Sequence, residues 1–247
     1  MMVKVWLIPV LCTAAFGGTI VVPNAETSTP GNGSGPPNAG PGIYQELFGA
    51  GQFASVSQID ITGVSFRAAP GAGALDFTLG TLNLYLSTSP NYPNSTSGPL
   101  MSSTFANNIG PDNTLVFSGT ATLSAPGCSG PGACPFGPAI DFATPFDYNP
   151  ANGRLLFDAV FTDLTPVSGE VDAEGFNPPG GSVAQVVEFG STTATTGSFD
   201  YGGDIAEFTF TSVPEPASWT MMAGAAALLW LGRRRRSGWL PGAQTGK

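Results

Sequence analysis

Between residues 43 and 211, apolar side chains alternate with polar ones in short runs that glycine, proline, asparagine and serine separate. A period of two residues is typical of strands that bury one face. One such run alternates Leu115, Phe117, Ala121 and Leu123 with hydroxyl residues and should leave its other face wet. Because no run keeps a helical period, we predict an all-β domain of about eight to ten strands, a single β-sandwich with jelly-roll or Greek-key connections.

Two glycines lie where the apolar positions change parity. Gly63 separates apolar positions 59 and 61 from positions 64 and 66, and Gly80 separates positions 77 and 79 from positions 82, 84 and 86. A one-residue slip would turn the apolar face toward water unless a bulge absorbs it. We therefore predict a bulged or bent strand at each glycine.

The N-terminal end has a lysine, an apolar run over residues 5–16 and then small residues. This order is typical of a secretory signal peptide, which we assign to residues 1–25, with cleavage after Ala15 or after Ala25. Residues 26–42 are rich in glycine, proline, serine and asparagine. They offer little to bury, so we predict a disordered linker there and place the ectodomain at residues 43–212.

The C-terminal end has a proline-flanked acidic segment, then uncharged apolar residues 217–232, then a basic cluster and a tail at residues 237–247. The first segment is Val213, Pro214, Glu215 and Pro216, and the basic cluster is Arg233, Arg234, Arg235 and Arg236. The prolines should keep the acidic segment extended and accessible. A helix over 217–232 rises about 24 Å, short of the roughly 30 Å hydrocarbon core, so we predict a marginal transmembrane segment with its basic end in the cytoplasm. A permanent anchor, or a buried helix with a solvated basic tail, are the alternatives.

These parts, in this order, resemble the PEP-CTERM sorting signal of Gram-negative bacteria. The resemblance implies export, transient anchoring in the inner membrane and cleavage near Pro214, Glu215 and Pro216 by an exosortase, a membrane transpeptidase-like enzyme. It also implies release or attachment at the cell surface and its exopolysaccharide. The family signal usually ends near the arginines, whereas eleven residues follow them here. Residues 100–119 are similar to a segment of other PEP-CTERM proteins with β-rich bodies, which brings no known activity.

Charge and residue types exclude several functions. The chain has a net charge of −9, but residues 26–216 hold only Arg67 and Arg154 against all 17 acidic residues, a net charge of −15. Such a body repels nucleic acid, so we expect no nucleic-acid partner. The chain has no histidine, which rules out Ser-His-Asp and Cys-His catalysis, and we expect no enzymatic activity. Glycoside hydrolysis by a carboxylate pair remains an alternative, for which the sequence selects no pair.

Cys128 and Cys134 lie in the segment Cys-Ser-Gly-Pro-Gly-Ala-Cys between two predicted strands. In an oxidising compartment we expect a local disulfide, with a soft-metal pair as the alternative. Zinc held by four histidine or cysteine side chains is excluded, because no histidine is present and only Cys12, in the predicted signal peptide, is left besides this pair.

Acidic residues cluster in two predicted loops. Glu170, Asp172 and Glu174 lie in one, and Asp200 and Asp204 flank a Tyr-Gly-Gly segment. Oxygen ligands at such spacing could hold calcium, and Glu170, Asp172 and Glu174 are the candidate ligands. Solvated loop carboxylates are the interpretation that the sequence favours, so we expect no cofactor.

Tyr92 and Tyr148 lie on predicted loops and are candidate carbohydrate contacts, because sugar rings stack on aromatic side chains. Every tryptophan lies near an end of the chain, and the alternating phenylalanines fit a core. We therefore expect an exported protein of the cell surface or extracellular matrix with a structural or adhesive role. A carbohydrate-binding module for exopolysaccharide is the nearest alternative.

Overall fold

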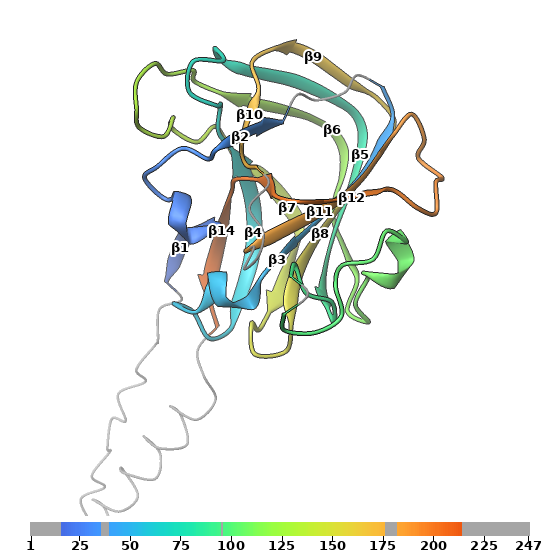
Figure 1. Ribbon diagram of the computed structural model, residues 1–247. Helices are drawn as coiled ribbons and strands as arrows, with labels where there is room; N and C mark the ends of the chain where they lie inside the picture. Colours follow the sequence, from blue (N-terminus) through green and yellow to red (C-terminus); the bar gives the residue numbers. More distant parts are fainter. Residues whose placement is uncertain (1–15, 36–39, 95, 176–181, 214–247) are drawn as a thin grey trace, which may run out of the picture. The chain divides into compact units, whose positions relative to one another are not determined.

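Two large antiparallel sheets build the protein in the computed structural model, which describes residues 16–35, 40–94, 96–175 and 182–213 (Figure 1). The first sheet has the order β1 (Gly17–Val22), β14 (Ala206–Ser212), β4 (Ile59–Phe66), β7 (Ile140–Tyr148). The second has the order β12 (Ser198–Tyr201), β11 (Val183–Phe189), β3 (Gly42–Phe48), β8 (Arg154–Phe161), β5 (Leu75–Ser89), β6 (Thr114–Ala125), and β9 (Leu164–Ser168) also pairs with β5.

A third, small sheet has the order β13 (Gly203–Asp204), β10 (Val171–Glu174), β2 (Gly33–Gly35). Three short 3₁₀ turns complete the described elements: η1 (Asn24–Glu26), η2 (Ala50–Phe53) and η3 (Phe105–Asn107). The predicted all-β class is confirmed. Within the described ranges no helix has the length and apolar character to cross a membrane, and the predicted membrane segment 217–232 lies outside those ranges.

Aromatic side chains join the two large sheets across a common core. Phe48 of β3 meets Phe208 of β14 edge to face, with ring centroids 5.5 Å apart. Phe66 of β4 meets Phe157 of β8 in the same way at 6.1 Å. Edge-to-face pairs add to the free energy gained by burying the rings. The two sheets therefore pack through their apolar faces, as the alternating pattern predicts.

Both predicted bulges are present. The pairing of β4 with β7 shifts register between Ile61 and Gly63, and the pairing of β5 with β6 shifts between Leu79 and Thr81. A Cβ at Gly63 would lie 2.8 Å from Thr209 Oγ1. A Cβ at Gly80 would lie 2.9 Å from Thr162 Oγ1. Glycine suits both positions because residues of neighbouring segments approach its Cα closely at the bulge.

A further bulge in β6 corrects the predicted alternation. Leu115 is 43% exposed, whereas its neighbour Val116 is fully buried. The register of β5 with β6 shifts here, because Leu84 pairs with Phe117 and Tyr85 pairs with Leu115. At this point of the strand Val116, and not Leu115, therefore faces the core. The expectation that Leu115 points inward is wrong.

The outer face of the second sheet carries a second apolar cluster. Leu47 of β3 and Leu156 of β8 pack there with Met101 and Phe105. Asn108 holds the segment with Met101 and Phe105 against this face of the sheet. Its Nδ2 donates hydrogen bonds to Gln45 Oε1 at 2.9 Å and to the Ser102 carbonyl at 2.8 Å. Strand β8 is consequently buried on both faces.

The N-terminal part of the domain differs from the prediction. Strand β1 lies at the edge of the first sheet, pairs with β14 along its whole length and buries Ile20 and Val22. The boundary expected at residue 25 therefore falls inside the folded domain. Signal-peptide cleavage after Ala15 would keep β1, whereas cleavage after Ala25 would remove it.

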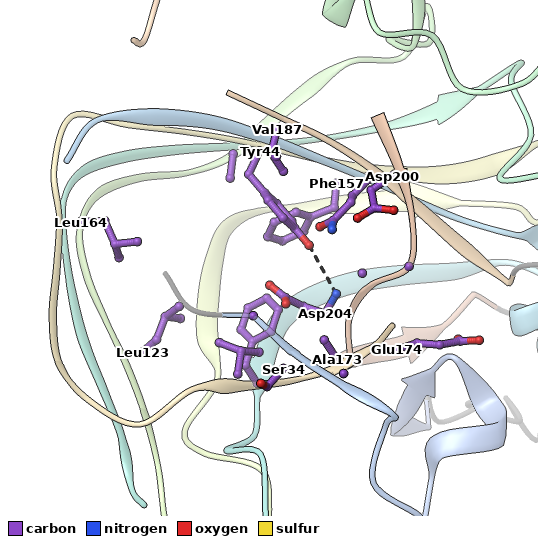
Figure 2. Close-up of a pocket in the computed structure, with 18 of the residues that line it drawn as sticks. Ser34, Tyr44, Leu123, Phe157, Leu164, Ala173, Glu174, Val187, Asp200 and Asp204 are labelled. Carbon is purple, nitrogen blue, oxygen red and sulfur yellow. Dashed lines mark hydrogen bonds between the residues drawn. The ribbon is translucent and has the colours of Figure 1, made fainter. Parts of the chain in front are cut away.

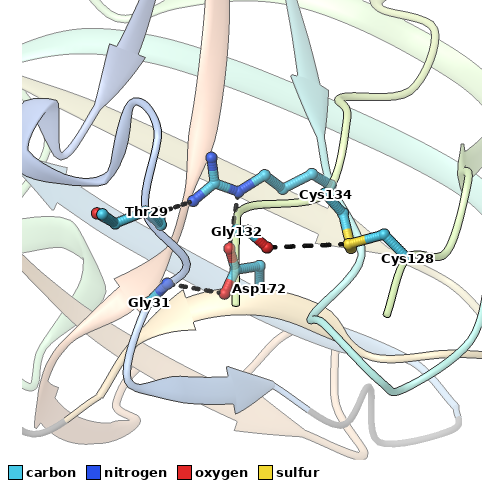
Figure 3. The surroundings of a disulfide bond; sticks show 7 residues. Thr29, Gly31, Cys128, Gly132, Cys134 and Asp172 are labelled. Atoms are coloured by element: carbon cyan, nitrogen blue, oxygen red, sulfur yellow. Dashed lines mark hydrogen bonds and ion pairs between the residues drawn. A yellow bond between two sulfur atoms is a disulfide. The ribbon is translucent and has the colours of Figure 1, made fainter. Parts of the chain in front are cut away.

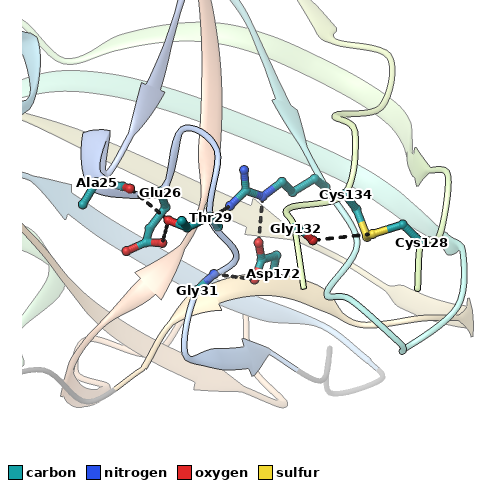
Figure 4. Close-up of polar contacts among 9 residues, drawn as sticks. Ala25, Glu26, Thr29, Gly31, Cys128, Gly132, Cys134 and Asp172 are labelled. Atoms are coloured by element: carbon teal, nitrogen blue, oxygen red, sulfur yellow. Dashed lines mark hydrogen bonds and ion pairs between the residues drawn. A yellow bond between two sulfur atoms is a disulfide. The ribbon is translucent and has the colours of Figure 1, made fainter. Parts of the chain in front are cut away.

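Residues 26–35 also belong to the fold and are not a disordered linker. Strand β2 pairs with β10, and a Cβ at Gly31 would collide with the Ala173 carbonyl oxygen. The amide of Gly31 donates to Asp172 Oδ1 at 3.0 Å, and the carbonyl of Thr29 accepts from Arg67 Nη2 at 2.7 Å (Figure 4). Small residues are used here because the backbone itself makes the contacts. The low hydrophobicity of the segment therefore does not prevent it from ordering.

A buried ion pair holds this segment. Arg67 Nε lies 2.7 Å from Asp172 Oδ2, and each side chain is 1% exposed (Figure 3). The guanidinium also lies 5.1 Å from the centroid of the Phe136 ring. Both Asp172 oxygens are used, one by Arg67 and one by the Gly31 amide. Such a pair is stable only when its partners stay together, because an unpaired buried charge is costly.

We expect Asp172→Ala to lower the free energy of unfolding by about 3–5 kcal/mol, because it leaves the Arg67 charge buried without a partner. Urea unfolding measures the change. The control is Asp141→Ala at an exposed position of β7, expected to change stability by less than about 0.5 kcal/mol. Equal stability of the two variants would contradict the role assigned to the ion pair.

Candidate functional site

A cavity of about 600 Å³ lies among residues of all three sheets (Figure 2). Its wall is mainly apolar and includes Phe66, Phe77, Leu84, Leu123, Phe157 and Leu164. These residues come from β4, β5, β6, β8 and β9, so both large sheets contribute. The volume is in the range of about 300–1,000 Å³ that is typical of small-molecule sites.

One side of the cavity is polar. Tyr44, Gln185, Asp200 and Asp204 line it, together with Glu174 at the end of β10. The Tyr44 hydroxyl accepts a hydrogen bond from the Asp204 amide at 3.3 Å, and Figure 2 shows Tyr44 pointing toward Asp204. In the same view Leu123 and Leu164 lie on the side away from Asp200 and Glu174. The cavity therefore has an apolar part and an acidic part.

Glu46 lies behind this acidic part. Its Oε2 accepts a hydrogen bond from the Tyr44 hydroxyl at 3.0 Å, and the residue is fully buried. Among the described residues none gives Oε1 a hydrogen bond. That oxygen faces Gly203, which lines the cavity, and a Cβ at residue 203 would collide with it. A buried acceptor without a donor is costly, so this oxygen needs an explanation.

Burial controls the protonation of the acidic part. It raises the pKa of the Glu46 carboxyl well above its usual value, and the neighbouring Asp204 adds to the effect. Burial also raises the pKa of Asp204 to about 7. No lysine or arginine lines the cavity, and the two arginines of the described ranges are engaged elsewhere, Arg67 with Asp172 and Arg154 over the Tyr92 ring. These carboxyls therefore lack a cationic partner within the described domain.

The three candidate calcium ligands do not form a site. Asp172 is committed to Arg67 and Gly31, and Glu174 Oε2 accepts from the Ser182 hydroxyl at 3.0 Å. Glu170 is partly exposed just before β10. Across the described part of the chain, no group of three or more cysteine and acidic side chains could hold a metal ion. Residues 170, 172 and 174 share one parity, so alternation along the strand does not separate them. The commitment of Asp172 to Arg67 and of Glu174 to Ser182 explains the lack of a shared site.

The two candidate carbohydrate contacts have different surroundings. Tyr148 lies at the end of β7 and not on a loop; it is fully buried, donates to the Gly153 carbonyl at 3.0 Å and packs against Phe53. The placement of Tyr148 on an accessible loop is therefore wrong. Tyr92 does lie on the connection between β5 and β6 and is half-buried, with the Arg154 guanidinium 3.1 Å from its ring centroid. That contact already covers one face of the Tyr92 ring.

The predicted disulfide is present. Cys128 and Cys134 are joined by a 2.03 Å bond, which Figure 3 shows near Asp172. The two sulfurs are thus bonded to each other and do not form a metal pair. Cys134 is buried, and the Gly71 amide donates to the Cys128 carbonyl, so the loop is also held by backbone contacts.

The cavity was not predicted, although the sequence contains a signal for its acidic part. Tyr44, Glu46 and Phe48 share one parity in β3, and that parity faces the core. A glutamate at an inward position of a strand is unusual, because a buried charge needs a partner. The spacing of Asp200 and Asp204 is a weaker signal, since it fits solvated loop residues equally well.

We expect the protein to become more stable as the pH falls from about 8 to about 5. Asp204, with a pKa raised to about 7, and Asp158 of β8, with a pKa raised by burial to about 6, bind protons more tightly when folded than when unfolded. The free energy of unfolding therefore falls as the pH rises through these values, by up to about 1.4 kcal/mol per pH unit for each carboxyl. Urea unfolding across this range measures the slope.

The double variant Glu46→Gln/Asp204→Asn should flatten this pH dependence, because it removes two of the buried carboxyls. Asp141→Asn, at an exposed position, is the control and should keep the slope of the unmodified protein. A double variant with an unchanged slope would show that the buried carboxyls do not control the effect.

Comparison with known protein families identifies the C-terminal end. The model of the PEP-CTERM protein-sorting motif matches residues 212–236. This match covers the predicted segment Val213–Pro216 and the arginine cluster 233–236; residues 214–236 lie outside the described ranges. Comparisons with curated proteins and with solved structures find no significant match. The chain therefore carries a PEP-CTERM sorting motif that begins where strand β14 ends, and this motif implies an exported protein with transient membrane anchoring and processing by an exosortase.

Proposed function

We propose that the protein is a non-enzymatic component of the cell surface or extracellular matrix with a structural or adhesive role. In this proposal an exosortase cleaves the chain near Pro214, Glu215 and Pro216 and removes the basic end. The observation that carries the proposal is the position of the sorting motif, which starts at residue 212, the last residue of β14.

The pairing of β14 supports cleavage that leaves the domain intact. Strand β14 lies between β1 and β4 and forms ladders with both, and Ser212 pairs with Ile59. The Ser212 amide also donates to the Phe16 carbonyl at 2.9 Å. A cut after residue 213 therefore removes none of the described strands, and the sheet can persist without the membrane-directed end.

The charge of the released domain supports an extracellular role. Residues 16–213 contain two arginines and 16 acidic residues, a net charge of −14, and both arginines are engaged in the fold. Such a surface favours solubility and disfavours binding to anionic lipid head groups. Removal of the arginine cluster would thus convert a membrane-directed chain into an acidic, water-soluble domain.

The test follows the protein in cells with and without the exosortase, by immunoblot of membrane and extracellular fractions with an antibody against the ectodomain. We expect a shortened extracellular form only when the exosortase is present. The variant Pro214→Ala/Glu215→Ala should accumulate as full-length protein in the membrane fraction. Glu188→Ala, in β11 and outside the motif, is the control and should be processed normally. Equal processing of both variants, or processing without the exosortase, would contradict the proposal.

A further inference from the structure

The cavity is large enough for a molecule with a long apolar part. Leu79, Leu82, Phe161 and Leu164 line it in addition to the aromatic side chains already described. These side chains offer no strong hydrogen-bonding group, so they favour an aliphatic or ring hydrocarbon over a sugar. Apolar surface in the cavity is better covered by a ligand than by water, which can make few hydrogen bonds there.

The acidic part of the cavity requires a ligand group that donates hydrogen bonds. Tyr44 uses its hydroxyl proton for Glu46 and accepts from the Asp204 amide, so it has no proton left to donate. Glu46 Oε1 has no donor among the described residues, although the side chain is fully buried. This oxygen lies against Gly203, which lines the cavity, whereas Glu46 itself lies behind the cavity wall. A positive group bound beside Asp204 would therefore offset the buried Glu46 carboxyl without touching it.

The charge of the cavity wall indicates which kind of donor group a ligand should have. Glu174, Asp200 and Asp204 line the acidic part, and within the described ranges no basic side chain lines the cavity. A carboxylate or phosphate head group would lie beside these carboxyl groups and would find no cationic side chain among the lining residues. A protonated amine provides up to three N–H donors and a positive charge, and both complement this part of the cavity.

From these observations we propose that the cavity binds an amphipathic organic amine, with its ammonium group at Asp204 and Asp200, in front of the buried Glu46, and its hydrocarbon part against Leu123 and Leu164. Figure 2 shows Asp200 and Glu174 on the side away from the two leucines, with Asp204 between them, as this orientation requires. The small sheet β13-β10-β2 provides the polar rim, because Ser34, Glu174 and Gly203 line the cavity there. This site is independent of the sorting motif.

The test is native mass spectrometry of the protein purified from exporting cells, titrated with decylamine, decanol, decanoate and butylamine. We expect one molecule of decylamine to bind at least tenfold more tightly than decanol. Decanoate should bind more weakly than decanol, because its charge is repelled. Butylamine, with the same head group and a short chain, should bind more weakly than decylamine, which separates cavity binding from attraction to the acidic surface.

Variants locate the bound amine. Asp204→Asn keeps the shape of the side chain and should weaken decylamine binding at least tenfold while leaving decanol binding unchanged. Asp141→Asn, an exposed acid on β7, should leave both unchanged. Ala159→Leu, or Ala173→Leu if the first variant fails to fold, narrows the cavity and should weaken decylamine and decanol alike.

Three results would overturn the proposal: no binding of decylamine, decanoate binding as tightly as decylamine, or decylamine binding that neither Asp204→Asn nor the alanine-to-leucine variant changes. The same spectra report the mass of the chain, so a failure of binding is distinguished from a failure of C-terminal processing.

Discussion

The buried pair between Arg67 and Asp172 links three parts of the chain that are far apart in sequence. Arg67 follows strand β4, Asp172 lies in β10, and Thr29 and Gly31 bring the N-terminal segment to the same point (Figure 4). Removing two charges from water is unfavourable unless every partner is in place. The segment before β2 must therefore fold with the rest of the domain, and this fixes the small sheet that forms the polar rim of the cavity.

The acidic part of the cavity meets the same constraint in a different way. Arg67 neutralises Asp172, but Glu46 and Asp204 have no cation beside them in the described domain. Burial therefore raises the pKa of each carboxyl and favours the protonated form. An ammonium group in the cavity would provide a positive partner for Asp204, as Arg67 does for Asp172. It would also offset the charge of Glu46, which lies behind the cavity wall. The need of buried carboxylates for positive partners thus explains both the contacts that hold the N-terminal segment and the proposed ligand.

The sequence predicted the features that local side-chain patterns determine. The class of the fold, the bulges at Gly63 and Gly80 and the disulfide are such features, because parity, glycine and cysteine spacing act over a few residues. The predicted inward position of Leu115 was wrong because the extra bulge in β6 has no glycine at the point where parity changes. The local pattern of apolar and polar residues does not reveal a bulge that depends on pairing with a neighbouring strand.

Other features depend on contacts between distant residues and could not be predicted. Residues 26–35 resemble a linker in composition, and only the buried ion pair supplies the partners that order their backbone. Tyr148 was placed on a loop because Asn149 and Pro150 follow it, although β7 extends to include it. Predicting the cavity would require knowing that β3, β11 and the turn before Asp204 lie next to one another. The sequence did not allow the strand order to be predicted.

On this structure, the mature protein is a single domain that begins before β1 and ends just after β14. Top-down mass spectrometry of the exported protein determines both ends of the chain in one measurement. We expect a chain that starts between residues 15 and 17 and ends between residues 213 and 216. A chain that starts at Glu26, or one that retains Lys247, would contradict it.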